Sequence, residues 1–336
     1  MNKSDTIQLA HGGGGRLTRE LIDKEIVSRF GDGPLKGLPD AASLSVSGND
    51  IIFTTDSFVV QPLEFPGGNI GDLAIHGTVN DISVSGGMPK WLSMGMILEE
   101  GLSIELLGRV LDSVKAAADK CGVQIVTGDT KVVAKGECDG IYINTSGIGE
   151  KIEGFDLGTD KIHEGDVVIS SGTIGDHGMA VLSARKGIGI ENGPLSDTAA
   201  VNPLVAALND LAGEVRFMRD PTRGGVATVL NEVVEDSSLG IVLGEGDIPL
   251  SKGTKAVSEM LGLDPLHSAC EGRLLAVCSA EASEKIIDLW KAFPEGAGAC
   301  VIGRVTPDSG RVILETFMGG RRLVDVPRGE VLPRIC

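Results

Sequence analysis

The chain has 336 residues and a net charge of −17, from 47 acidic and 30 basic residues. This balance argues against binding to nucleic acid, which requires clustered Lys and Arg, and we expect a cytoplasmic protein. The sequence shows no signal-peptide pattern and no apolar stretch long enough to cross a membrane, so we expect no membrane partner. The length is sufficient for two domains.

The six cysteines are scattered and form no Cys-x-x-Cys pair, which argues against a disulfide framework or a zinc site and favours a reducing compartment. They lie at positions 121, 138, 270, 278, 300 and 336. Three of them, Cys121, Cys278 and Cys300, lie among apolar residues and are predicted to be core residues.

The first half of the chain predicts an alternation of strands and helices. A short strand at 7–10 runs into a loop with four consecutive glycines at 12–15, which fits a phosphate cradle and a merely flexible loop equally well. Asn69 is placed to cap a helix, and Gly122 to end the next one. Helices are predicted over 17–30, 69–85 and 103–121, and strands over 51–55, 91–98, 123–126 and 141–148.

The second half repeats the mixture. A strand at 166–170 leads into a glycine-rich loop at 172–178 and a helix. Further helices are predicted over 198–211, 225–236, 252–261 and 283–293, and further strands over 241–243, 274–278 and 311–314. Strands and helices mixed in two successive halves predict two α/β or α+β domains with a boundary near residues 150–165.

Acidic residues at the ends of the predicted elements carry the candidate chemistry. Asp56 ends a strand, Asp81 lies on a glycine-flanked helix, and Asp129 follows a buried strand. Carboxylates without cysteine or histidine companions favour Mg²⁺, which usually brings the phosphates of a nucleotide. Lys131, two residues after Asp129, is a suitable cation for a phosphate. The alternative for any single aspartate is a helix cap or a turn.

Two further candidates lie in the second half. The segment RDPTRGG at 219–225 precedes a predicted helix, where backbone amides favour phosphate. His177 could act as a general base, but a lone histidine with no partner in the sequence is more simply structural.

The chain ends in Cys336, after a segment with two prolines and a glycine that predicts an extended tether. A frayed tail is one reading. The other is a swinging arm, because ten extended residues from 327 to 336 span at most about 33 Å and could carry the thiol into a cleft.

Five motifs together, with the terminal PRIC at 333–336, resemble the HypE family of hydrogenase maturation proteins, and the resemblance covers the chain from residue 11 to its end. The motifs are FPGGNIG at 65–71, GTVND at 77–81, VTGDTKVV at 126–133, SGTIGDHG at 171–178 and RDPTRGG at 219–225. Each motif is weakly specific alone, but their order and combination are highly specific.

The resemblance implies a two-domain fold of the aminoimidazole-ribonucleotide-synthetase-like (PurM-like) class. An N-terminal ATP-binding domain over 1–155 would form a β-barrel in a homodimer, an α+β domain would span 156–325, and a mobile tail would span 326–336. It implies a carbamoyl dehydratase. HypF would load a carbamoyl group onto Cys336, the enzyme would convert it to a thiocyanate with ATP and Mg²⁺, and the cyano group would pass to iron on the HypC–HypD complex for a [NiFe] hydrogenase.

The resemblance also assigns roles to residues. Cys336 would accept the carbamoyl group, Glu271 would remove its N–H protons, and Lys131 would steady the transferring phosphate or the carbamoyl oxygen. ATP would be bound by residues in the motifs and by the metal ligands Asp56, Asp81 and Asp129. The remaining ATP contacts would be Asn80, Gly128, Asp220 and Arg223. Many relatives carry Asn where this chain has Cys270, so a hydrogen bond made by that Asn would be changed here.

Two other readings remain open. Selenophosphate synthetase and thiamine-monophosphate kinase share the aspartates, but neither explains the terminal cysteine, and no cysteine precedes Cys121 as a selenophosphate synthetase would usually require. A carrier without catalytic activity would present the thiol to partners, but the aspartates and Lys131 count against it.

Overall fold

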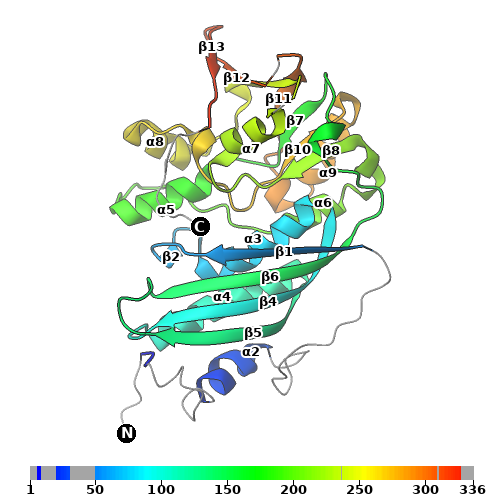
Figure 1. The fold of residues 1–336 in the computed structure, drawn as a ribbon. Helices are drawn as coiled ribbons and strands as arrows, with labels where there is room; N and C mark the ends of the chain where they lie inside the picture. The colour runs from blue at the N-terminus through cyan, green and yellow to red at the C-terminus, as the bar shows by residue number, and fades with distance from the viewer. Residues whose placement is uncertain (1–5, 9–19, 31–49, 236, 309, 327–336) are drawn as a thin grey trace.

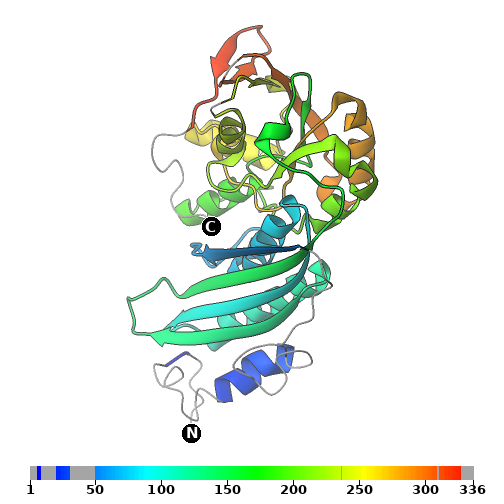
Figure 2. The same cartoon turned by 45° about the vertical axis from the view of Figure 1, so that its right-hand side comes forward.

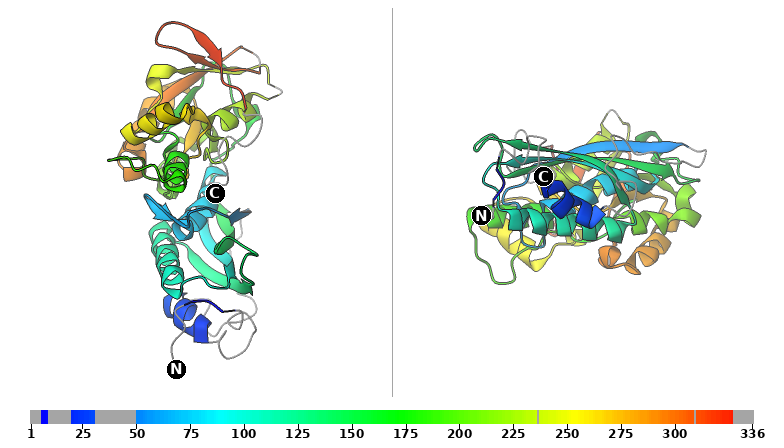
Figure 3. Two further views of the ribbon diagram at one scale, coloured as in Figure 1. Left: turned by 90° about the vertical axis from the view of Figure 1, so that its left-hand side faces the viewer. Right: turned by 90° about the horizontal axis from the view of Figure 1, so that it is seen from below.

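The structure, a computed structural model, describes residues 6–8, 20–30, 50–235, 237–308 and 310–326. They form two lobes stacked end to end (Figures 1 and 3). The N-terminal lobe is built on the sheet from β1 to β6, and the C-terminal lobe on the sheet from β7 to β13. None of the described helices is both long and apolar enough to cross a bilayer.

The sheet of the N-terminal lobe has four strands in the order β1-β6-β4-β5, and only the β4–β5 pair is parallel. β1 is the edge nearest the C-terminal lobe and β5 the edge farthest from it (Figures 1 and 2). The strands are β1 (Ile51–Phe58), β4 (Gly87–Glu99), β5 (Gln124–Val133) and β6 (Ile141–Lys151), and β2 (Glu64–Phe65) and β3 (Gly68–Asn69) form a separate hairpin.

Helices cover one face of this sheet (Figure 3). They are α2 (Ser28–Phe30) with the preceding π-helix η2 (Ile22–Val27), α3 (Ile70–Val84) and α4 (Ile104–Cys121). Asn69 caps α3 in a capping box with Asp72, Ser103 caps α4, and Gly122 ends α4 in the left-handed conformation. The apolar sides of α3 and α4 form one core with β4 and β6.

The opposite face of the sheet has no helix of the described residues on it. Side chains alternate along β1, so that even-numbered residues face α3 while Ile51 and Phe53 are exposed. Ile97 of β4 is exposed as well. We call this surface the open face; it runs across all four strands.

The C-terminal lobe has a seven-stranded sheet in the order β13-β12-β9-β11-β7-β10-β8, in which β12 and β9 are the parallel pair. Its strands are β7 (Val167–Ser170), β8 (Val215–Arg219), β9 (Gly240–Gly244), β10 (Leu275–Cys278), β11 (Cys300–Thr306), β12 (Val312–Glu315) and β13 (Arg321–Leu323).

The helices of this lobe lie around that sheet. They are α5 (Asp176–Lys186), α6 (Asn202–Ala206), α7 (Gly225–Val234), α8 (Lys252–Leu261) and α9 (Ser283–Lys291), with short 3₁₀ turns at Thr159–Lys161, Asn209–Glu214, Glu245–Asp247, Pro265–His267, Ala280–Ala282 and Pro294–Gly296. One core lies between α7 and the sheet, and a second includes α6, α9 and the fully buried Trp290.

The predicted α/β and α+β class is confirmed, and so is the type of most predicted elements. Several predicted elements differ in extent from the observed ones. The strand at 51–55 continues through Asp56 to Phe58, because Phe58 also packs into the core. The strand at 123–126 continues to Val133, because it stays paired with β4 along its whole length. The helix at 198–211 is limited to α6 and a 3₁₀ turn, and the strands β2, β3, β8, β11 and β13 were not predicted.

Candidate active site

Four carboxyl groups, two from each lobe, lie close enough together for their charges to act on one another. Asp56 lies on the edge strand β1, Asp81 in the last turn of α3, Asp220 directly after β8, and Glu271 in the loop before β10. We call these four residues the acidic cluster. Each of them was predicted from the sequence to belong to the site, and the structure brings all four together from both lobes.

The close approach of β1 to α3 sets the N-terminal side of the cluster. A Cβ at Gly77 would lie 2.7 Å from the ring of Phe58, so the glycine lets the strand pack directly on the helix. The same site lies 3.9 Å from Oδ2 of Asp56. One turn further along α3, Asp81 Oδ2 accepts a hydrogen bond of 3.0 Å from Thr54 Oγ1.

Burial and mutual repulsion raise the pKa of every carboxyl in the cluster. Burial raises the pKa of Asp56, and burial with the negative charge of Asp56 raises that of Asp81. Burial, with Asp81 and Asp56 as neighbours, raises the pKa of Asp220 to about 7. Burial and the charge of Asp220 hold the pKa of Glu271 well above its usual range. The cluster therefore has more negative charge than its surroundings balance.

Two arginines supply part of the positive charge that the cluster needs. Arg223 Nη2 lies 3.9 Å from Asp56 Oδ1, and the positive charge of Arg219 acts to lower the pKa of Asp81. A cleft of about 500 Å³ opens beside Asp81 and Arg219. Its other lining residues are Ile52, Phe53, Thr54, Val84, Ser85, Leu157, Gly158, Phe217 and Met218. The cleft thus has an apolar wall and a charged end.

The chemistry of the cluster fits a hard cation. Oxygen ligands with unbalanced negative charge are what Mg²⁺ prefers, and Mg²⁺ usually takes only one or two carboxylates together with substrate phosphates. Within the described ranges, no three His, Cys, Asp or Glu side chains lie close enough to hold a metal ion by themselves. Phosphate oxygens would have to complete such a site.

The structure does not bring Asp129 to this cluster within one chain. β5 continues as a strand through Asp129, which pairs across the sheet with Gly95, then Asn144, then Ser57. Three strand spacings separate it from β1, or about 14 Å. The predicted metal set of Asp56, Asp81 and Asp129 is therefore not assembled in this chain.

Lys131 and Gly128 lie on the same far strand. The side chains of Asp129 and Lys131 are 67% and 66% exposed and form an ion pair with each other at 3.0 Å. We call them the exposed pair. A Cβ at Gly128 would lie 2.4 Å from the carbonyl oxygen of Met94, so the glycine allows β5 to pair closely with β4.

Asn80 does not present its side chain to a ligand site in this structure. It is fully buried, and its amide donates to the carbonyl oxygens of Ala199 and Glu271 while its oxygen accepts from the N–H of Val201. The predicted contact of Asn80 with ATP is therefore not supported, because no donor of its amide is left for a nucleotide.

The Glu271 side chain contributes a buried oxygen without a hydrogen-bond partner to the cluster. It is 2% exposed, and its Oε1 has no hydrogen-bond partner among the described residues. Its neighbour Cys270 is fully buried, and the Sγ atom accepts a hydrogen bond of 3.1 Å from the N–H of Gly175. The thiol thus takes a structural contact in this loop.

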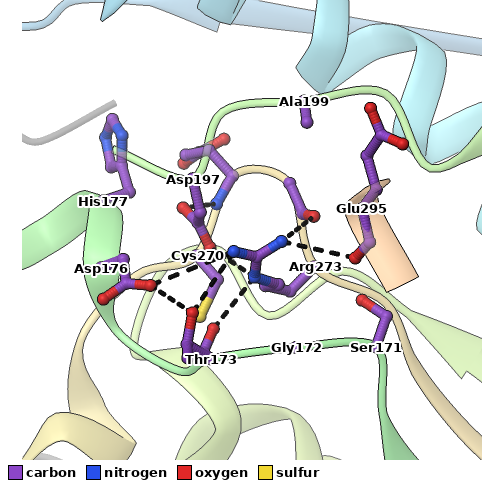
Figure 4. Close-up of polar contacts among 12 residues, drawn as sticks. Ser171, Gly172, Thr173, Asp176, His177, Asp197, Ala199, Cys270, Arg273 and Glu295 are labelled. Atoms are coloured by element: carbon purple, nitrogen blue, oxygen red, sulfur yellow. Dashed lines mark hydrogen bonds and ion pairs between the residues drawn. The ribbon is translucent and has the colours of Figure 1, made fainter. Parts of the chain in front are cut away.

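Arg273, two residues after Glu271, is the centre of a network of polar contacts (Figure 4). The guanidinium is 3.5 Å from Asp197 Oδ2 and 4.0 Å from Asp176 Oδ2, and it donates to the carbonyl oxygen of Thr173 at 3.0 Å. Sequence analysis did not identify Asp197 or Arg273. Asp197 stands in Ser-Asp-Thr before a predicted helix, a pattern that indicates only a helix cap.

His177 has a structural role in the structure. The ring is buried, Nδ1 lies 2.8 Å from Ser196 Oγ, and the ring packs edge-on against Phe65 at a centroid distance of 5.3 Å. Cys121 and Cys278 are buried as predicted, whereas Cys300 is only partly buried. Cys336 and the glycine-rich loop at 12–15 lie outside the described residues.

Comparisons with known proteins add to this geometry. Two family models match the chain: the N-terminal domain of AIR synthase related proteins over residues 39–150, and the C-terminal domain over residues 163–315. The carbamoyl dehydratase HypE of Azotobacter vinelandii is 43% identical over 99% of this chain and 98% of its own length. That of Rhizobium leguminosarum bv. viciae is 46% identical over 98% and 95%.

Solved structures agree with these matches. A crystal structure of the hydrogenase maturation protein HypE in complex with ATP has a TM-score of 0.93 and 42% identity, over 98% of this chain and all of that chain. A HypE–HypF complex matches with a TM-score of 0.80 and 44% identity, over 91% and 99%. A thiamine monophosphate kinase from Aquifex aeolicus has a TM-score of 0.58 at 20% identity, over 91% of this chain and 96% of that chain, which shows a shared fold alone.

Proposed function

The chain belongs to the HypE family and is a carbamoyl dehydratase of hydrogenase maturation, and we propose that its acidic cluster carries out the ATP-dependent dehydration of a carbamoyl group bound to Cys336. The product would be a thiocyanate, the source of the cyanide ligands on the iron of a [NiFe] hydrogenase. The observation that supports this most is the buried, unpartnered carboxyl of Glu271 among three aspartates from both lobes.

The reaction replaces a poor leaving group by a good one. The carbamoyl oxygen attacks the γ-phosphoryl group of ATP and ADP departs. The C–O bond then breaks with phosphate as the leaving group, while the nitrogen loses both protons and the carbon–nitrogen triple bond forms. Glu271, as a carboxylate, is the proposed base for one of these protons, because a carboxyl with a raised pKa binds a proton more strongly than an ordinary one. The departing phosphate carries the second proton away.

The other members of the cluster would bind ATP and Mg²⁺. Asp56, Asp81 and Asp220 are the proposed cation ligands, and Arg223 is positioned to contact phosphate. Bound Mg²⁺ would neutralise charge on the phosphates during transfer. The cleft beside Asp81, with its apolar wall, is the proposed place for the nucleoside.

We propose that the exposed pair belongs to the active site of a second copy of the chain. The open face carries exposed Phe53, Ile51 and Ile97, which a monomer would leave in water. A second copy packed on this face would bury them and would bring Asp129 and Lys131 towards the partner's site. Lys131 would then steady the transferring phosphate, as sequence analysis expects, and the homodimer would close the barrel.

We also propose two protein partners. HypF, which assembles with a relative in a solved complex, is the proposed carbamoyl donor for Cys336. The HypC–HypD complex is the proposed acceptor of the cyano group. Thiamine-monophosphate kinase activity is not proposed, because that relative shares only the fold.

Mass spectrometry of the C-terminal peptide tests the proposal. After loading by HypF, the peptide should gain a carbamoyl group, and after addition of ATP and Mg²⁺ it should become lighter by one water. Cys336→Ala should never gain the carbamoyl mass but should still bind ATP. A carbamoylated peptide that stays unchanged with ATP, in protein that hydrolyses no ATP, would instead support a non-catalytic carrier.

A further inference from the structure

The backbone of Glu271 is held from two directions by buried polar side chains. Its N–H donates to Asp197 Oδ1 at 3.0 Å, and its carbonyl oxygen accepts from Asn80 Nδ2 at 3.1 Å. Asp197 belongs to the C-terminal lobe and Asn80 to α3 of the N-terminal lobe. Both peptide groups that flank the Glu271 Cα are therefore fixed, one by each lobe.

One segment of the C-terminal lobe, between α5 and α6, contains Asp197, binds Asn80 and runs across the surface where the lobes meet. We call residues 196–202 the crossing segment. Its Ser196 N–H donates to the carbonyl oxygen of Pro66 at 2.7 Å, and its Asn202 amide donates to the carbonyl oxygen of Cys121 at 3.1 Å. The N–H of Val201 donates to Asn80 Oδ1 at 2.8 Å. The segment thus attaches to the N-terminal lobe along its length.

Asp197 is held by a second contact as well. Its side chain is 1% exposed, and Oδ2 faces the guanidinium of Arg273 at 3.5 Å (Figure 4). Arg273 is in turn fixed by its bond to the carbonyl oxygen of Thr173. The oxygen that accepts from Glu271 therefore has little freedom to move.

The loop of Glu271 also touches the crossing segment without spare room. A Cβ at Gly272 would lie 1.8 Å from the carbonyl oxygen of Asp197 and 2.6 Å from the nitrogen of Ala199. On the other side, the N–H of Cys270 donates to the carbonyl oxygen of Pro221 at 2.9 Å, next to Asp220. A shift of the crossing segment would therefore shift Glu271.

We propose that Asn80 and Asp197 are positioning residues that hold the Glu271 carboxyl in place for proton removal. The inference rests on the proposed role of Glu271 as the base. Because Oε1 has no hydrogen-bond partner among the described residues, the backbone and the packing set where the carboxyl lies. A displacement of about 1 Å can slow a reaction by about 10²-fold, so loss of either backbone contact should slow dehydration without affecting carbamoyl loading.

Three variants test the contacts. Asp197→Ala removes the acceptor for the Glu271 N–H, whereas Asp197→Asn keeps an acceptor oxygen there. Asn80→Asp keeps an acceptor for Val201 but loses both donors. Single-turnover conversion of carbamoylated to cyanated peptide should slow by about 10- to 100-fold in Asp197→Ala and Asn80→Asp. It should slow by less in Asp197→Asn, while loading by HypF and ATP affinity stay at wild-type values.

A double-mutant cycle separates positioning from a general loss of structure. If Asp197 acts through Glu271, then Asp197→Ala should change the rate less than about twofold in a Glu271→Gln background. The matched control is Asn231→Asp on α7, because Asn231 also donates to two backbone carbonyls, those of Ala227 and Val324, but contacts no part of the Glu271 loop. This control should lower the unfolding midpoint and leave the dehydration rate unchanged.

The outcomes are distinct. Wild-type dehydration rates in Asp197→Ala and Asn80→Asp, with a slow Glu271→Gln, would overturn the positioning role alone. A wild-type rate in Glu271→Gln would overturn the proposed base instead. Full additivity in the double-mutant cycle would also sink the positioning role, because the two residues would then act independently. If Asp197→Ala does not fold, the cycle is measured with Asn80→Asp.

Discussion

The acidic cluster and the exposed pair both contain aspartates from the sequence motifs, Asp81 and Asp220 in the cluster and Asp129 in the pair, yet the structure gives them different surroundings. The cluster lies between the lobes, where burial and neighbouring charges raise its pKa values, that of Asp220 to about 7. The exposed pair lies on the far edge of the sheet, two-thirds exposed, with each charge balanced by the other. The carboxylates of the acidic cluster have lost hydration without gaining enough neighbouring positive charge. Asp129 of the exposed pair has lost little hydration.

The difference in burial and charge balance indicates which of the two sites needs a cation. An ion pair in water contributes little and attracts no further ion strongly. Several half-buried carboxylates repel one another, and a divalent cation removes that repulsion. If the exposed pair has a catalytic role, it must therefore acquire it from a surface outside this chain. Four predictions test this comparison.

Asp81→Asn should have the largest effect. It removes one charge from the cluster at the mouth of the nucleotide cleft, so Mg²⁺-dependent ATP turnover should fall by about 10³-fold. The protein should stay folded, because the change relieves repulsion from Asp56. Steady-state ADP formation measures the loss of turnover, and Asp288→Asn on the exposed side of α9 is the control. Wild-type turnover in Asp81→Asn would remove this carboxylate from the proposed cation site.

Lys131→Ala should slow ATP turnover by about 10²-fold if the exposed pair completes a partner's site. Mixing this variant with Asp81→Asn gives the sharper test. In a site shared across two copies, each mixed dimer contains one intact site, so a 1:1 mixture should regain about a quarter of wild-type turnover. No recovery in mixtures that exchange subunits would place Lys131 outside a shared site.

Asp220→Asn should change stability in a pH-dependent way. The carboxyl has a pKa raised from 3.8 to about 7, so between these values the folded chain holds a proton that the unfolded chain has released. The free energy of unfolding of the wild-type protein should therefore fall as pH rises through this window. At pH 8 without Mg²⁺ the variant should be more stable by on the order of 4 kcal/mol, and at pH 3 equally stable.

Denaturant unfolding of both proteins at the two pH values measures this difference. A variant that is less stable than wild type at pH 8 would contradict the raised pKa. The same substitution should impair Mg²⁺-dependent turnover, which would show stability and activity opposed at one residue.

The sequence predicted part of this arrangement for physical reasons that can be stated. Asn69 and Gly122 mark helix ends through local hydrogen bonds and backbone conformation, which need no distant partner, and both were predicted correctly. Gly128 was expected to lie beyond the end of the predicted strand at 123–126 and to contact ATP. In the structure it permits close pairing with Met94 of another strand, which no local pattern reveals.

The candidate site shows the same limit. Asp56 and Asp81 could be expected to converge, because the chain brings a strand and the following helix together. The sequence could not show that Asp129 lies outside the acidic cluster. The order of strands in the sheet places it far from β1, and local sequence patterns do not reveal that order. Asp197 and Arg273 act on the backbone of distant residues, and such contacts leave no signature in the residue types alone.

Asp129→Asn should have the smallest effect in a monomer. Substitutions at exposed positions usually change the free energy of unfolding by less than about 0.5 kcal/mol, and the carboxylate loses only a surface ion pair with Lys131. Unfolding measured at increasing protein concentration extends the test to the open face. If a second copy covers that face, the wild-type midpoint should rise with concentration, and Asp129→Asn should lower it only where the dimer is populated. An effect that is large and independent of concentration would contradict this, because it would require Asp129 to be buried within its own chain. In that case the exposed pair would not be a surface feature, and its contrast with the acidic cluster would be wrong.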